Sequence, residues 1–487
     1  MSGLPAGDGL PEGVVALLPE YLRRQRWFGG DQAPDAASVR VLDAAELTAT
    51  ADGAHRLLWA IVGVTGGPPG AASDGDVAEE AADAGAGPPA AAESSATVRY
   101  QLLIGERPNG EHAEFLKGHE PSVLGSVDDR YYYDAVVDPE LTLAWLRVVT
   151  DGSLSAERVR PVNAEQSNTS LVYDDKLIAK LFRRLHEGPN PDVVVTEALA
   201  RVGFAHVAQP AAVWRRDGTD LAFVQQFLAG GTEGWALALT SLRDLYSFRC
   251  ESPSEAGGDF AHEASRLGQV TGEMHLAMAN AFGVDRDEFR EIGWPAILSE
   301  IEEQLRAVVG AAFSGSGEEL IEELRRVSDP GPAIRVHGDY HLGQVMRTDA
   351  GWFVLDFEGE PARAMNERLA FTSPFKDVTG MLRSFHYAAH FALLERERYE
   401  QEELLPQAER WEQHNRQAFL DGYFGTPGIG ALLPERPEVR EAVSLALELQ
   451  KALYEVAYEQ AYRPDWIAIP TQAINRILAG SYHGLAG

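Results

Sequence analysis

The first part of the chain alternates apolar and polar runs in the pattern of a small β-sheet. Residues 38–42, 56–64 and 97–104 are rich in valine, leucine, isoleucine and aromatic residues, and they predict three strands of one sheet. The segment 66–96 consists mostly of glycine, alanine, proline and acidic residues, so we predict a disordered insertion there. A hairpin tolerates such an insertion, because the entropy cost of closing a loop grows slowly with its length. We therefore expect a small β-sheet subdomain over residues 1–146.

A second strand-rich stretch covers residues 147–228. Its short apolar runs are separated by turn-forming residues, and one of its strands carries a single lysine. The predicted elements are strands at 171–173 and 177–182, a turn at Asp174 and Asp175, and a helix at 193–201. We expect this stretch to form a β-rich lobe.

Beyond residue 228 the apolar positions recur at helical spacing. The predicted helices cover residues 259–279, 294–309, 318–327, 373–396, 409–423 and 438–462. A helical lobe over residues 229–487 therefore follows the β-rich lobe. The fold class predicted from this order is α+β and bilobal.

Composition and charge narrow the classes of molecule that the protein is expected to bind. The formal net charge is −32, from 74 acidic and 42 basic residues. Nucleic acids and anionic membranes both require a cationic surface, so we expect neither as a partner. The one cysteine excludes an internal disulfide, and the longest apolar run, at 57–64, has eight residues and is too short to span a bilayer. No N-terminal signal is apparent, so we expect a soluble cytoplasmic protein.

The segment 336–344 (VHGDYHLGQ) and the acidic residues that follow the apolar run 352–355 carry the candidate chemistry. A loop aspartate, Asp339, is placed to orient a substrate hydroxyl and accept its proton. Gln344 and Asp356, with Glu358 two residues on, offer the oxygen ligands that Mg²⁺ prefers. Each motif alone is more often an ordinary turn or strand end. Together and in this order they favour phosphoryl transfer from a nucleotide, which depends on positioning and charge neutralisation.

A kinase also needs a basic residue for the donor phosphates, and the chain has only five lysines. Lys180 lies at the end of an apolar strand, and Glu197 lies on the helix that follows. A strand lysine paired with a helix glutamate is the arrangement by which protein kinases bind the α- and β-phosphates. The alternative is an edge-strand lysine that points to water. The loop before the strand lacks glycine, so its hydroxyl and amide side chains are the candidate phosphate contacts: Ser167, Asn168 and Thr169.

Several blocks of the sequence, taken together, resemble the maltokinase family, within the aminoglycoside-phosphotransferase-like kinases. The matching blocks are residues 23–30, 164–170, 233–235, 336–345, 355–363 and 451–470. The resemblance implies a bilobal protein-kinase-like fold with an extra N-terminal cap sheet. It also implies transfer of the γ-phosphate of ATP to the anomeric hydroxyl of maltose, with Mg²⁺ as cofactor. The product, maltose 1-phosphate, would feed α-glucan and glycogen synthesis.

The resemblance also assigns roles to single residues. Asp339 would be the catalytic base, Gln344 and Asp356 the Mg²⁺ ligands, and Lys180 with Glu197 the pair at the nucleotide phosphates. The hinge segment 225–228, with Gln226 and Leu228, would contact adenine through its backbone. The implied partners are the sugar and MgATP. An association with enzymes of α-glucan and trehalose metabolism stays open.

Residues 364–390 depart from the family pattern, on the acceptor side of the metal segment. Lys376 replaces an arginine and His386 replaces a glutamate, whereas Asp377 and Arg383 are kept. The identity of the sugar is therefore open: glucosamine, another saccharide or an aminoglycoside are alternatives to maltose. The candidate acceptor residues are His341, Arg383, Glu455 and Tyr458. A non-catalytic pseudokinase is a further alternative, disfavoured because every predicted catalytic, metal and phosphate residue is present.

Overall fold

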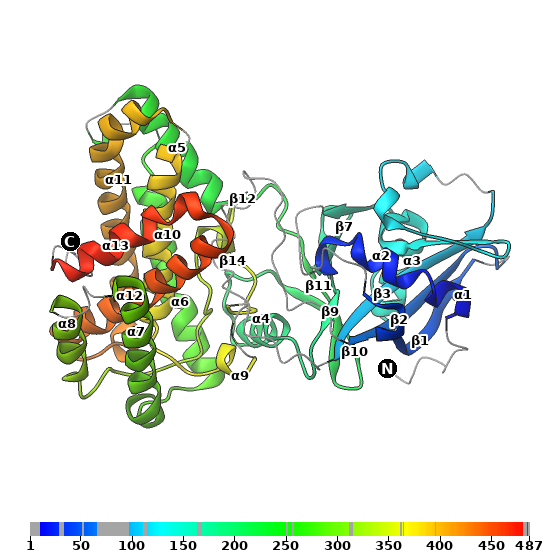
Figure 1. Cartoon of the computed structure of the whole chain (residues 1–487), viewed down its shortest axis with the longest axis horizontal. Helices are drawn as coiled ribbons and strands as arrows, with labels where there is room; N and C mark the ends of the chain where they lie inside the picture. The colour runs from blue at the N-terminus through cyan, green and yellow to red at the C-terminus, as the bar shows by residue number, and fades with distance from the viewer. Residues whose placement is uncertain are drawn as a thin grey trace. The chain divides into compact units, whose positions relative to one another are not determined.

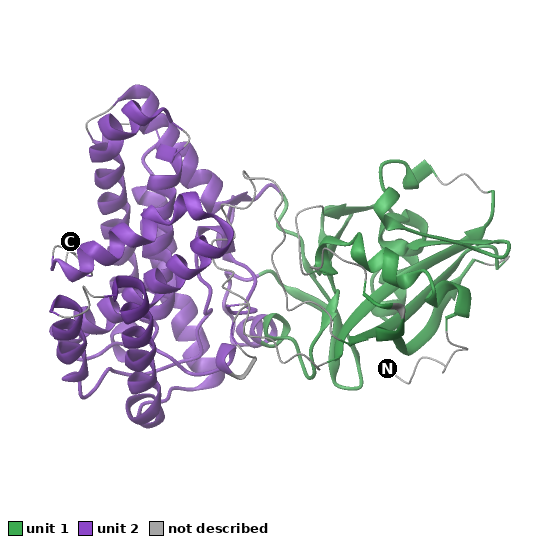
Figure 2. Cartoon of the chain, viewed as in Figure 1, with its two compact units in different colours: residues 1–75, 89–194, 208–229 green, residues 76–88, 195–207, 230–487 purple. Residues whose placement is uncertain are grey.

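The computed structural model describes residues 10–28, 34–50, 53–65, 97–110, 114–162, 168–249, 252–255, 258–310, 315–360, 363, 365–394, 396–480 and 485. These residues form two compact units, coloured green and purple in Figure 2. Among the described residues, unit 1 takes in 10–194 and 208–229, and unit 2 takes in 195–207 and 230 onward.

Unit 1 contains the predicted cap sheet. Its strands are β1 (Val39–Ala49), β2 (Arg56–Thr65), β3 (Thr97–Pro108), β4 (Val123–Val127), β5 (Arg130–Asp134) and the short β9 (Arg184–Leu185). The order is β1-β2-β3-β5-β4, with β9 also on β3. Thr65 at the end of β2 pairs with Thr97 at the start of β3, which confirms that the two strands form one antiparallel pair. The insertion predicted at 66–96 lies outside the described residues.

A second sheet in unit 1 confirms the next group of predicted strands. Its order is β10 (Pro210–Arg216), β11 (Thr219–Gln226), β8 (Leu177–Phe182), β7 (Asn168–Tyr173) and β6 (Val159–Val162). The turn between β7 and β8 has positive φ at Asp174 and Asp175, the backbone that a tight hairpin requires.

The two sheets of unit 1 share one core. Trp214 of the second sheet lies 5.7 Å from Trp59 of the first and 6.3 Å from Trp145, measured between ring centroids. Trp145 belongs to α3 (Pro139–Val149), a helix that the sequence pattern did not predict. Two short helices, α1 (Glu12–Val15) and α2 (Leu18–Arg23), contribute to a separate apolar cluster with β2 and β3.

Unit 2 is helical, with one small sheet. Its helices are α5 (Gly234–Phe248), α6 (Ala261–Phe282), α7 (Trp294–Val309), α8 (Ser316–Arg325), α9 (Met365–Arg368), α10 (Phe375–Leu394), α11 (Arg398–Phe424), α12 (Pro437–Tyr462) and α13 (Ala468–Leu478). The sheet has the order β12 (Thr232–Glu233), β13 (Val345–Thr348) and β14 (Gly351–Val354). The six predicted helices are confirmed, α7 with the predicted bounds, whereas α5 and α13 were not predicted. Helix α4 (Pro191–Arg201) joins the two units in sequence.

Helix α10 lies at the centre of unit 2, where it packs on α5, α11 and α12 (Figure 1). Every residue from Asp377 to Leu393 on α10 is buried. Helices α6 and α11 approach so closely that a Cβ atom on Gly268 would lie 1.9 Å from the carbonyl oxygen of Phe419. Among the described residues, no helix combines the length and the hydropathy needed to cross a bilayer.

Candidate active site

The segment 336–344 forms a loop whose backbone is hydrogen-bonded to helix α10. Asp377, in the first turn of α10, accepts hydrogen bonds from the backbone N–H groups of His337 and Gly338, both at 2.8 Å. Gly338 has φ +88°, a conformation that favours glycine. The next residue along this fixed backbone is Asp339. The loop is therefore positioned by one buried carboxylate.

Asp377 itself belongs to a buried chain of hydrogen bonds across three helices. His275 of α6 lies 3.1 Å from the Asp377 carboxylate through Nε2 and 2.9 Å from the hydroxyl of Tyr423 on α11 through Nδ1. Burial works to raise the pKa of Asp377, but its hydrogen bond to His275 and the nearby imidazoles outweigh burial, so the pKa lies below its usual value. Asp377 is therefore ionised, as an acceptor of backbone N–H groups must be.

His337 ties the loop to the end of β14. Its Nε2 lies 2.8 Å from the carbonyl oxygen of Leu355, which can only accept, so Nε2 carries the proton. Its Nδ1 then accepts from the backbone N–H of Asp339, at 3.4 Å. The ring also packs 4.9 Å from the ring of Phe357. His337 is thereby engaged in holding Asp339 rather than in proton transfer.

The structure brings two predicted metal ligands together. The side-chain nitrogen of Gln344 donates to the carboxylate of Asp356 at 3.4 Å. Asp356 has φ +60°, a left-handed backbone that non-glycine residues adopt rarely. A carboxylate next to an amide is a donor set that suits Mg²⁺. Glu358 lies on a turn, because β14 ends at Val354. Strand alternation therefore does not place Glu358 relative to Asp356, and its role as a metal ligand remains a prediction.

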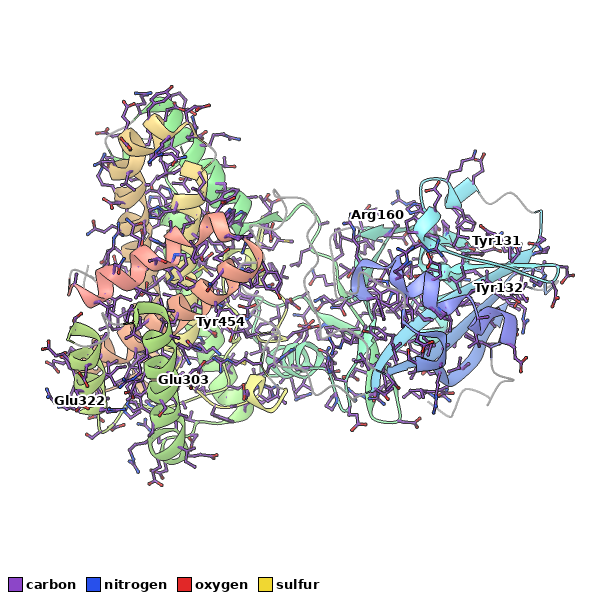
Figure 3. The ribbon with its side chains drawn as sticks, viewed as in Figure 1. Tyr131, Tyr132, Arg160, Glu303, Glu322 and Tyr454 are labelled. Atoms are coloured by element: carbon purple, nitrogen blue, oxygen red, sulfur yellow. The ribbon has the colours of Figure 1, made fainter. Side chains whose placement is uncertain are left out.

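The residue that the sequence interpretation missed is Lys451, on α12. Its Nζ lies 3.3 Å from Oδ1 of Asp339 and 3.2 Å from Oε1 of Glu360, and its side chain is only 18% exposed. The ammonium also lies 4.8 Å from the ring of Tyr454, which is labelled in Figure 3. One signal was available: this lysine is one of five in the whole chain and lies in a block that resembles maltokinases.

Lys451 controls the charge of the catalytic candidate. Burial works to raise the pKa of Asp339, but the adjacent ammonium and two imidazoles reverse this effect, and the pKa lies below its usual value. Burial likewise works to lower the pKa of Lys451, and the two carboxylates raise it instead. Both groups are therefore charged at neutral pH.

Glu360 has further cationic partners. Its carboxylate lies 3.0 Å from Arg363 and 4.0 Å from Lys376. Arg363 in turn pairs with Glu300 of α7 at 2.7 Å. Asp339 and Glu360 are thus both paired with basic side chains of the protein.

The candidate acceptor residues lie in the interior of unit 2. Burial lowers the pKa of His341 to about 4, so its imidazole is neutral, and Nδ1 accepts from the backbone N–H of Gly343 at 3.0 Å. Arg383 and Glu455 are both buried and hydrogen-bonded to each other at 2.6 Å, joining α10 to α12. Tyr458 is buried on the same helix as Glu455. Their contact with a sugar remains a prediction.

The candidate nucleotide residues lie on β7, β8, β11 and α4. Lys180 on β8 forms an ion pair with Asp192, in the first turn of α4, at 3.1 Å. The predicted partner, Glu197, lies further along the same helix by about one and a half turns. The described ion pair of Lys180 is therefore with Asp192, and its pairing with Glu197 stays a prediction.

The remaining nucleotide candidates are partly described. Thr169 accepts a hydrogen bond from Arg183 at 2.8 Å, and Asn168 begins β7. Gln226, at the end of β11, is exposed, and Leu228 just beyond it is half-buried. Ser167 lies outside the described residues. Their contact with ATP remains a prediction.

Two models of known families match this chain. A model of the phosphotransferase enzyme family matches residues 158–401, half of the chain. The chain belongs to the phosphotransferase enzyme family. A second model, of the maltokinase N-terminal cap domain, matches residues 21–138. The predicted relationship to kinases of this family with a maltokinase-type cap is confirmed.

The relatives include two glucosamine kinases. The protein from Mycolicibacterium smegmatis is 27% identical over 348 residues, which cover 67% of this chain and 81% of the relative. That from Streptacidiphilus jiangxiensis is 26% identical over 342 residues, covering 66% and 73%. A solved glucosamine kinase in complex with glucosamine, ADP and inorganic phosphate superposes with a TM-score of 0.63 at 18% identity, covering 98% of this chain and all of that one. The predicted protein-kinase-like fold is thereby confirmed.

Proposed function

We propose that this protein is an ATP- and Mg²⁺-dependent sugar kinase that phosphorylates the anomeric hydroxyl of maltose. The observation that carries the proposal is the loop at 336–344, which carries the ionised, buried Asp339 and ends at Gln344, whose side chain is hydrogen-bonded to Asp356. The maltokinase-type cap at 21–138 supports the acceptor. The product, maltose 1-phosphate, would enter α-glucan synthesis, and we place the reaction in the cytoplasm, where ATP is available.

Each residue has a role in the proposed reaction. Asp339 orients the sugar hydroxyl and accepts its proton late in the transfer, which a carboxylate of low pKa does when the transition state is loose. Gln344, Asp356 and Glu358 would bind the Mg²⁺ that accompanies ATP, and the bound ion would neutralise phosphate charge. Lys180 would contact the donor phosphates. The sugar oxygen gains the phosphoryl group, and ADP leaves.

The charges around Asp339 favour a neutral acceptor. An amino sugar brings an ammonium group, which is most stable next to unpaired carboxylates. Here Lys451 already places an ammonium between Asp339 and Glu360, at 3.3 and 3.2 Å. A second cation beside it would be repelled, whereas the hydroxyl groups of maltose would accept and donate hydrogen bonds without that cost.

Glucosamine is the second candidate acceptor. It is favoured by the two relatives at 27% and 26% identity, both named glucosamine kinase. An amino group bound away from Lys451 would escape the repulsion described above. The two candidates therefore differ in a measurable way, since only one of them carries a charge.

The test is an ATP-consumption assay with Mg²⁺ and a panel of maltose, glucose, glucosamine, trehalose and an aminoglycoside, with phosphorus NMR of the product. We expect an anomeric phosphate on maltose. Turnover of glucosamine with maltose inert would replace the proposed acceptor and keep the kinase. No turnover of any acceptor by a folded protein that binds MgATP would contradict the kinase proposal and favour a pseudokinase. The Asp339→Asn variant is the control for background ATP hydrolysis.

A further inference from the structure

A buried cluster of two histidines and a glutamate lies within the helices of unit 2, apart from the active-site loop. His386 and His390 are one turn apart on α10, and Glu412 faces them from α11. One ligand atom from each of the three residues lies within 4.8 Å of the others. All three side chains are buried.

The two histidines have unsatisfied nitrogen atoms. Nδ1 of His386 lies 2.9 Å from the Glu412 carboxylate, but Nε2 of His386 and Nε2 of His390 have no hydrogen-bond partner among the described residues. The centroids of the two rings are 4.3 Å apart, with the ring planes tilted by 52°. A buried polar atom without a partner is costly, so a native structure usually fills such a position with water or an ion. Here two buried imidazoles, each with one such atom, lie beside a buried carboxylate.

We propose that His386, His390 and Glu412 form a binding site for a divalent transition-metal ion of the zinc type. Two imidazoles and one carboxylate are a known zinc donor set, and three protein ligands leave one position for water. Histidines spaced by four residues on a helix present both rings on one face. Ligand atoms around zinc lie about 3.3 Å apart in a tetrahedral site with bonds of about 2.0–2.1 Å, so small side-chain rotations suffice.

The charges around the cluster permit a cation. Three arginines lie nearby, and each has another carboxylate as its closer partner. Arg416 lies 3.6 Å from Glu412 but 3.0 Å from Glu448. Arg383 pairs with Glu455, and Arg476 pairs with Glu409. Glu412 is therefore shared between a longer contact to Arg416 and the shorter one, at 2.9 Å, to the His386 imidazole.

Burial keeps one of the two imidazoles in the neutral form that can bind a metal. It lowers the pKa of His390 to about 3, so this ring is neutral at pH 7 and keeps a lone pair for a metal. The alternative to a metal is an ion pair between a protonated His386 and Glu412, which would leave His390 outside the interaction. The two possibilities predict different roles for His390.

The proposed ion would be structural rather than catalytic. His386 lies nine residues from Asp377 along α10, about 13 Å for an α-helix. A metal would join α10 to α11, and α10 carries the carboxylate that positions the active-site loop. Soft or borderline metals prefer nitrogen ligands, whereas Mg²⁺ prefers oxygen, so this site is chemically distinct from the proposed magnesium site.

The test uses the full-length protein loaded with Co²⁺, a spectroscopic substitute for zinc, and, separately, with Zn²⁺. After removal of weakly bound metal by dialysis, we expect one tightly bound ion per chain, visible Co²⁺ absorption bands typical of low coordination number, and a rise in Tm with Zn²⁺ that excess Mg²⁺ does not reproduce. Because none of these readouts is kinase activity, failure of the proposed acceptor would not affect the result.

Histidine variants test whether the metal ion binds at this cluster. His390→Asn and His386→Asn should each lose the bound ion and the absorption bands. His262→Asn, which changes an exposed histidine on α6, should keep both. Should the cluster variants fail to fold, the native protein still decides: no retained metal and no Co²⁺ bands would overturn the proposal. Equal metal binding in His390→Asn and the native protein would overturn it as well.

Discussion

Replacing Lys451 with methionine removes the ammonium that joins Asp339 to Glu360 and keeps the length of the side chain. Removing one partner of a buried ion pair costs about 3–5 kcal/mol, because a charge is left without its partner. The lysine side chain is only 18% exposed, so solvent compensates little. Glu360 keeps Arg363 and Lys376, so Asp339 is the group left unpaired. We therefore expect a loss at the lower end of this range, about 3 kcal/mol in the free energy of unfolding at pH 7.

The same substitution should change the pH dependence. In the native protein the pKa of Asp339 lies below its usual value, so its stabilising contribution is present above the pKa of the unfolded chain and is lost as pH falls through the folded pKa. Without the ammonium, burial and the neighbouring Glu360 raise the pKa of Asp339. The variant should therefore lose stability as pH rises, and the acid limb of its kcat/KM profile should move to higher pH.

The assays are urea unfolding at several pH values and initial rates of ATP consumption across the acid range. Lys117→Met is the matched control, because Lys117 is 80% exposed and its partner Glu114 is 87% exposed. An exposed pair contributes about 0–1 kcal/mol, so the control should resemble the native protein. Equal stability of the two variants, or an unchanged acid limb in Lys451→Met, would refute the role assigned to Lys451.

Three further substitutions test other parts of the structure. Asp339→Asn should keep ATP binding, measured by nucleotide fluorescence, and lower kcat by roughly 10²–10⁴-fold; near-native turnover would remove Asp339 from the chemistry. Asp356→Ala should abolish activity at any Mg²⁺ concentration. An unchanged dependence of activity on Mg²⁺ concentration would indicate that Glu358, and not Asp356, binds the ion. Gly268→Ala should lose about 1–3 kcal/mol in urea unfolding because its Cβ would clash with a backbone oxygen of α11 at 1.9 Å, whereas Gly430→Ala, with no atom within 4 Å, should lose little.

Local patterns predicted most of the elements. The strands at 171–173 and 177–182 and the helix at 294–309 follow from apolar periodicity and turn residues, which act over a few positions. Helix α5 (Gly234–Phe248) was missed because it begins directly after the short strand β12, without a side chain that caps its first turn. The sequence thus predicts a helix or strand well where its apolar pattern and its turn or cap residues all lie within a few neighbouring positions.

The residues that position the active site could not be predicted in the same way. Asp377 contacts the loop backbone 39 and 40 positions earlier in the chain, and Lys451 contacts Asp339 across 112 positions. These contacts depend on how α10 and α12 pack, which no local pattern encodes. The ion pair of Lys180 with Asp192 has a similar origin, since it depends on where α4 starts relative to β8.

Three helices pack around the loop that carries Asp339, and this packing determines which substitutions could change the sugar acceptor without disturbing the loop. The loop that carries Asp339 is fixed by α10 through Asp377, by α6 through His275, and by α12 through Lys451. A substitution in the loop itself would disturb phosphoryl transfer with any sugar. The departures from the maltokinase pattern at Lys376 and His386 leave Asp377 and Lys451 unchanged, so the contacts that hold the loop are kept. A change of acceptor is therefore compatible with an unchanged loop around Asp339.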